Sequence, residues 1–75
     1  MSNEAILQNY FLKTKIGHYD GSLKQLAHII SCANNRYIPP NDVQTFITRN
    51  SFLEHYTVKF SIMDGDTHIV ISHRN

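Results

Sequence analysis

The sequence predicts an α+β domain in which three helices precede a C-terminal β-hairpin. Apolar residues recur at helical spacing through the first two thirds of the chain, and they alternate with polar residues near its end. An Asp64-Gly65 dipeptide lies within the alternating segment and is typical of a two-residue hairpin turn. Because 75 residues suit one small core, we expect a single domain over residues 1–75.

The first helix is expected over about residues 2–15. Ile6 with Tyr10, and Leu7 with Phe11, are i,i+4 pairs on one side of such a helix. These pairs form an apolar stripe that can face a core.

The connector over residues 16–21 is expected to be mostly loop. Gly17 is typical of the residue after a helix end. A short extended piece is expected around His18-Tyr19, but the predicted sheet contains the two hairpin strands alone.

The second helix is expected over about residues 22–34. Ser22 and Gln25 have the spacing of a capping box at its start. Asn34 or Asn35 can end it, because asparagine tolerates the left-handed conformation. The inward positions at helical spacing are Leu23, Leu26, Ala27, Ile30 and Ala33.

The third helix is expected over about residues 41–50. Pro39 and Pro40 favour an extended approach, and Asn41 is the expected N-cap. Residues 51–54 can form a further short turn before the hairpin. The expected inward side chains of this helix are Val43, Phe46 and Ile47.

The hairpin is expected over about residues 56–73. A turn at Asp64-Gly65 pairs Phe60 with Ile69, Val58 with Ile71 and Ile62 with Thr67. This register keeps the apolar side chains on one face, so Phe60 is expected to be buried, and Phe60→Ala would then cost ~3–5 kcal/mol. The expected outer face carries Thr57, Lys59, Ser61, His68, Val70 and Ser72.

The order of these elements is similar to that of winged-helix proteins. In that arrangement the third helix is the recognition element and the hairpin is the wing. The likeness concerns topology and implies no function by itself.

Composition excludes several function classes. Seven basic and six acidic residues give a net charge of +1, without the excess of basic residues typical of nucleic-acid binding. Neither a signal sequence nor a membrane-spanning apolar run is visible. The single cysteine, Cys32, cannot form an internal disulfide. We therefore expect a cytoplasmic protein without membrane association.

The sequence shows no catalytic or metal-binding motif. The five histidines lack the spacing of zinc ligands, and Cys32, within a predicted apolar helix segment, is expected to be a small buried residue. The carboxylates of Asp64 and Asp66 are explained by turn formation. A chain this short also leaves little room for a pocket of ~300 Å³. We expect no enzyme activity, no metal and no cofactor.

The tyrosines favour protein binding. Tyr19 and Tyr37 lie in predicted loops, and tyrosine is enriched at protein interfaces. His68 and Val70 lie on the outer hairpin face, where the arm over residues 67–72 can pair with another strand. The sequence therefore predicts a small regulatory or adaptor protein that binds another protein, with a second copy of the chain among the candidate partners.

DNA binding is the alternative hypothesis. Polar side chains that can read base edges lie on the third helix, namely Gln44, Thr45, Thr48 and Arg49. Lys59 can contact a phosphate from the hairpin. The acidic tip, with Asp64 and Asp66, argues against this role because a wing tip lies along phosphates.

Overall fold

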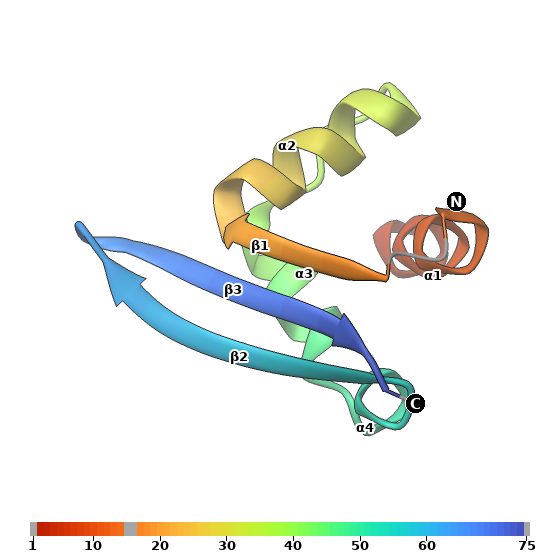
Figure 1. Ribbon diagram of the computed structural model, residues 1–75. Coiled ribbons are helices and arrows are strands. Elements are labelled where there is room, and N and C mark those ends of the chain that lie inside the picture. The colour runs from red at the N-terminus through yellow and green to blue at the C-terminus, as the bar shows by residue number, and fades with distance from the viewer. Residues whose placement is uncertain (1, 15–16, 75) are drawn as a thin grey trace.

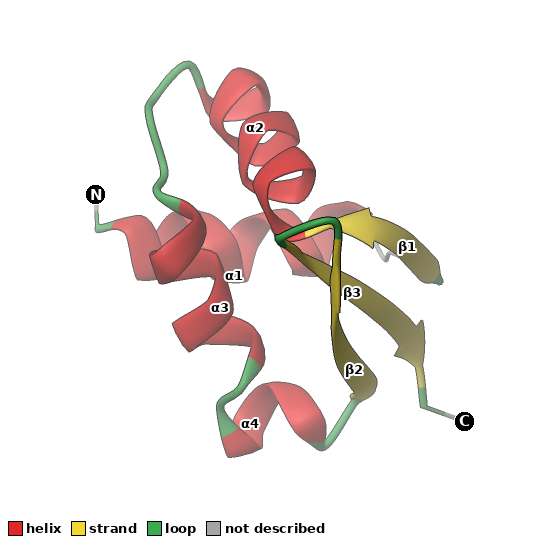
Figure 2. Cartoon of the chain, turned by 90° about the vertical axis from the view of Figure 1, so that its left-hand side faces the viewer, coloured by secondary structure: helices red, strands yellow, loops and turns green. Residues whose placement is uncertain are grey.

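The computed structural model describes residues 2–14 and 17–74, and these form helices on one side of an antiparallel sheet (Figures 1 and 2). The sheet in these ranges has three strands in the order β1-β3-β2. This confirms the predicted α+β class. The elements in chain order are α1 (Asn3–Thr14), β1 (His18–Ser22), α2 (Leu23–Asn34), α3 (Pro40–Ile47), α4 (Asn50–Leu53), β2 (Tyr56–Met63) and β3 (Asp66–His73).

The predicted ends of α2 are confirmed. The hydroxyl oxygen of Ser22 accepts a hydrogen bond from the backbone N–H of Gln25 at 3.0 Å, which satisfies one of the free donors at the helix start. At the other end Asn35 has a φ of 51° and occupies the left-handed C-cap conformation.

The third helix begins one residue before the expected range, and its predicted N-cap is wrong by two residues. Pro40 is the first residue of α3, and Pro39 rather than Asn41 is the N-cap. Proline suits this first position because its missing N–H would have no helical partner. The helix ends at Ile47, and Asn50 begins the separate short helix α4.

The connector after α1 forms the strand β1 of the sheet, whereas it was expected to be mostly loop. Within β1, Tyr19 pairs with Ile71 and Gly21 pairs with Ile69. β3 is consequently the central strand, and the expectation that residues 67–72 form an exposed arm is wrong. Both edges of β3 are already hydrogen-bonded within the chain.

The predicted hairpin turn and register are confirmed. Asp64 and Gly65 have φ values of 54° and 81°, as a two-residue turn of this kind requires. Phe60 lies opposite Ile69, and the neighbouring pairs follow the predicted register.

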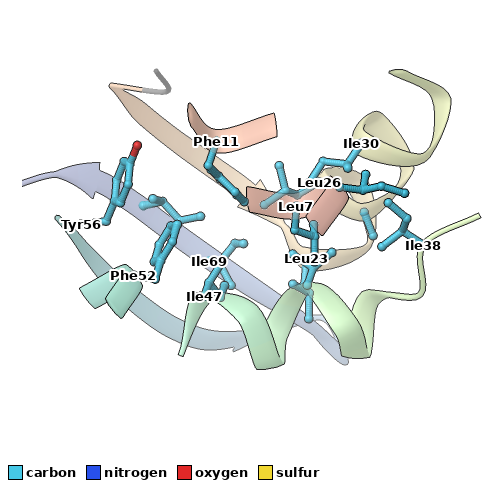
Figure 3. Packing of buried hydrophobic residues seen from close by; sticks show 14 residues of the cluster. Leu7, Phe11, Leu23, Leu26, Ile30, Ile38, Ile47, Phe52, Tyr56 and Ile69 are labelled. Carbon is cyan, nitrogen blue, oxygen red and sulfur yellow. The ribbon is translucent and has the colours of Figure 1, made fainter. Parts of the chain in front are cut away.

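The hydrophobic core lies between the helices and the inner face of the sheet (Figure 3). Helix α2 packs against β1 and β3, whereas α4 packs against β2. The side chains with the least exposure in this cluster are Leu7, Leu26, Ile30, Ile38, Val43, Ile47, Ile69 and Ile71.

The expectation that Phe60 is buried is wrong. Its side chain is 43% exposed, whereas that of its cross-strand neighbour Ile69 is 0% exposed. Ile62, on the same face, is 73% exposed. The face was predicted correctly, but the helices do not cover the last part of β2.

Candidate protein-binding surface

Three large apolar side chains are exposed together at the end of β2. Phe60 and Ile62 lie on the face towards the helices, and Met63 lies on the opposite face, 55% exposed. We call Phe60, Ile62 and Met63 the β2 strip. Among the three strands described, β2 is terminal, so one of its edges has no neighbouring strand. The strip therefore combines apolar surface with free backbone hydrogen-bonding groups.

A groove lies between α1, the α3–α4 region and the paired ends of β2 and β3. Its volume is about 810 Å³, so the expectation that the chain is too short for a pocket is wrong. We call it the aromatic groove, because its lining includes Phe11, Phe46, Phe52 and Tyr56.

The rings of the aromatic groove contact one another across three helices and a strand. Phe11 of α1 lies with its ring centroid 5.8 Å from that of Phe46 and 5.0 Å from that of Phe52. Phe52 stacks on Tyr56 at 4.5 Å. These contacts close the bottom of the groove with side chains that also belong to the core, so the groove is partly a packing feature.

An ion pair joins two elements at the rim of the aromatic groove. The Arg49 guanidinium, at the α4 N-cap, donates hydrogen bonds to both carboxylate oxygens of Glu4 in α1. Hydrogen bonding and the charge of Arg49 lower the pKa of Glu4, and the same contact raises the pKa of Arg49. Arg49 is therefore engaged within the chain, which weakens its candidacy as a base-reading residue.

The other residues proposed for DNA binding are exposed but do not form one surface. Gln44, Thr45 and Thr48 are exposed at α3 and its C-cap. The hydroxyls of Thr45 and Thr48 donate to helix carbonyls at 3.0 and 2.9 Å. Lys59 lies opposite Val70 on the sheet face that points away from the helices, so it does not join the α3 side chains.

The residues predicted for a protein interface are also distributed over different elements. Tyr37 is 74% exposed in the link between α2 and α3. Val70 is half-buried on the outer sheet face. On the same face, the imidazole Nε2 of His68 lies 2.5 Å from a carboxylate oxygen of Asp20.

Tyr19 lies in β1 rather than in a loop. It packs against the core, and its hydroxyl donates to the Ser22 carbonyl at 2.9 Å. Burial is the main cause that raises the pKa of Tyr19, with smaller effects from Tyr10 and Asp20. This side chain supports β1 against the core, so it is less available for a partner than predicted.

Cys32 is exposed, which contradicts the expectation of a buried cysteine. Its sulfur lies 3.6 Å from Nε2 of His28, one turn earlier on α2. Over residues 2–14 and 17–74, no group of three His, Cys, Asp or Glu side chains converges in a way that could hold a metal ion. In the same ranges no helix is long and apolar enough to cross a membrane.

Sequence reasoning missed the β2 strip, although one signal was present. The cross-strand partner of Ile62 is the polar Thr67, which indicates that the core ends before this pair. Comparison of the chain with protein-family models, with curated proteins and with solved structures finds no match. The surfaces of the chain itself are therefore the guide to its function.

Proposed function

We propose that the chain is a small, non-enzymatic regulatory or adaptor protein that binds another protein through the β2 strip. The observation that carries this proposal is the exposure of Phe60, Ile62 and Met63 on a terminal strand. Exposed apolar side chains beside a free strand edge are the features by which sheets accept a partner strand. We propose a cytoplasmic location as part of the same hypothesis.

A pull-down from host lysate tests this proposal. The bait is the full chain, compared with an Ile62→Lys variant and with a Leu12→Lys control. Leu12 is 65% exposed on α1 at the aromatic groove, so both variants place the same charge on an exposed apolar position. Nuclease treatment of a parallel sample removes partners held through nucleic acid.

Ile62→Lys is expected to reduce partner recovery at least tenfold, which corresponds to about 1.4 kcal/mol of binding free energy. Leu12→Lys is expected to leave recovery unchanged. The opposite pattern would assign partner binding to the aromatic groove and contradict the proposal.

DNA binding by a winged-helix-type arrangement is the second candidate. The exposed polar side chains of Gln44, Thr45 and Thr48 on one helical segment favour it, and the order of helices and hairpin agrees with it. The engaged Arg49 and the net charge of +1 disfavour it. Salt-dependent, sub-micromolar binding of random duplex DNA would replace the protein-binding proposal with this one.

A further inference from the structure

We propose that the β2 strip binds a second copy of this chain, through antiparallel pairing of β2 with the partner's β2 about a two-fold axis at Phe60. The inference rests on the proposed function, because it names the partner of the same strip. Pairing of two three-stranded sheets in this way gives one continuous six-stranded sheet.

The backbone groups at the free edge of β2 follow from the hairpin register. Met63 and Asp66 flank the two-residue turn and form a hydrogen-bonded pair. Such pairs alternate along an antiparallel ladder, so Lys59 and Ser61 also bond to β3. The backbone N–H and C=O groups of Val58, Phe60 and Ile62 then point towards the free edge.

The same alternation is visible beyond the end of the strand. The backbone N–H of Arg74 donates to the carbonyl of His55 at 2.8 Å. His55 is separated from Lys59 and Ser61 by an even number of residues, so its backbone groups point to the same side, towards β3. The unpaired groups are therefore those of the residues that carry the apolar inner-face side chains of β2.

The two outer strands of the sheet differ in their suitability for pairing. β1 has five residues and carries Asp20 and Gly21, features that protect a strand edge from pairing. β2 has eight residues, with two members of the β2 strip on its inner face. The free edge of β2 is the longer and the more apolar, so it is the edge that a partner strand covers.

Among two-fold axes at Lys59, Phe60 and Ser61, near the middle of the exposed part of β2, charge and side-chain matching favour the one at Phe60. An axis at Lys59 would place two lysines directly opposite each other, which is unfavourable. An axis at Ser61 would place Val58 opposite the partner's Asp64. An axis at Phe60 instead pairs Phe60 with the partner's Phe60 and Val58 with the partner's Ile62.

In this register Val58, Phe60 and Ile62 each gain an apolar neighbour, whereas Tyr56, which α4 already covers, lies opposite the partner's Asp64. Lys59 lies opposite the partner's Ser61, so the two paired β2 strands place no like charges directly opposite each other. The net charge of +1 also produces little repulsion between copies. These features favour a second copy over an unrelated strand, whose side chains need not match.

Sedimentation of the full chain tests the association, from about 1 µM to about 1 mM. The mass is expected to rise from 8.7 kDa towards twice that value. Phe60→Lys places like charges opposite each other and is expected to raise the midpoint concentration at least tenfold, whereas Leu12→Lys is expected to leave it unchanged. Circular dichroism checks that each variant keeps its fold.

Disulfide cross-linking in a Cys32→Ser background tests the register. Directly opposite residues in a hydrogen-bonded antiparallel pair have Cα atoms about 5.5 Å apart, within disulfide reach. Phe60→Cys is therefore expected to cross-link rapidly on oxidation. In the same register Thr57 lies opposite the partner's Met63, so the control Thr57→Cys is expected to cross-link at least tenfold more slowly.

A mass that stays at 8.7 kDa up to about 1 mM would overturn the inference. Equal cross-linking of the Phe60→Cys and Thr57→Cys variants would also overturn it. Loss of a lysate partner in Ile62→Lys would still support the proposed function when the chain is monomeric. The two proposals can therefore fail separately.

Discussion

β2 and β3 carry the same alternation of apolar and polar residues, yet their apolar side chains have different environments. Ile69 and Ile71 of β3 are fully buried, whereas Phe60 and Ile62 of β2 are exposed on the same face. Phe60 and Ile69 are direct cross-strand neighbours. Alternation therefore specifies the face to which a side chain points, and the covering helices decide whether that side chain is buried.

The exposure of the inner-face side chains of β2 increases towards the turn. Tyr56 is buried beside α4, Val58 is partly buried, and Phe60 and Ile62 are exposed. β3, in contrast, lies between two strands and under α2. The hairpin thus extends beyond the helical layer on the β2 side, and this extension produces the β2 strip.

The largest expected effect concerns the buried member of the cross-strand pair. Ile69→Ala removes a fully buried side chain and is expected to lower the free energy of unfolding by about 2–5 kcal/mol. Urea denaturation at low protein concentration measures this loss. A loss below about 1 kcal/mol would mean that β3 is not the covered strand.

The exposed member of the pair provides the direct contrast. Phe60→Ala is expected to cost about 1–2 kcal/mol, because much of the ring is already in contact with water. The same denaturation experiment measures it in dilute solution, where association does not contribute. A cost equal to or above that of Ile69→Ala would remove the distinction between the two strands.

The turn that sets both strands in register gives a smaller effect. Gly65 has a φ of 81°, so Gly65→Ala is expected to cost about 1 kcal/mol through backbone strain. Gly17→Ala is the matched control, because no atom lies within 4 Å of the added Cβ. Equal thermal stability of the two variants would contradict the observed turn conformation.

The smallest expected effect on stability concerns the ion pair between Glu4 and Arg49. Because neither residue lies in β2 or β3, its loss is expected to affect both strands equally. Arg49 lowers the pKa of Glu4 from its ordinary value of 4.5. The stabilisation is therefore present above about pH 4.5 and is lost as the pH falls through the lower, folded-state pKa.

Glu4→Gln is expected to reduce the thermal midpoint slightly at neutral pH, and the difference from the unsubstituted chain is expected to shrink as the pH falls below the ordinary pKa of Glu4, 4.5. Thermal unfolding as a function of pH measures this change. A difference that grows on acidification would contradict the assigned direction of the pKa shift.

The sequence was sufficient to predict features that depend on neighbouring residues. The hairpin register follows from Asp64-Gly65 and the alternation around it. The start of α2 follows from Ser22 and Gln25, and the hydrogen bond between them is present. In each case the residues that determine the conformation lie within a few positions of one another.

Features that depend on distant residues could not be predicted in the same way. The segment His18–Ser22 has no apolar alternation and becomes a strand because it pairs with β3. Glu4 and Arg49 are 45 residues apart. The aromatic groove likewise combines rings from separate helices, so its volume follows only from their packing.

Amide hydrogen exchange along β2, measured residue by residue, tests the central claim most directly. In dilute solution the amides of Val58, Phe60 and Ile62 are expected to exchange at least tenfold faster than those of Lys59 and Ser61, which bond to β3. They are expected to become protected as the protein concentration rises. Protection of all five amides in the dilute monomer would contradict the account.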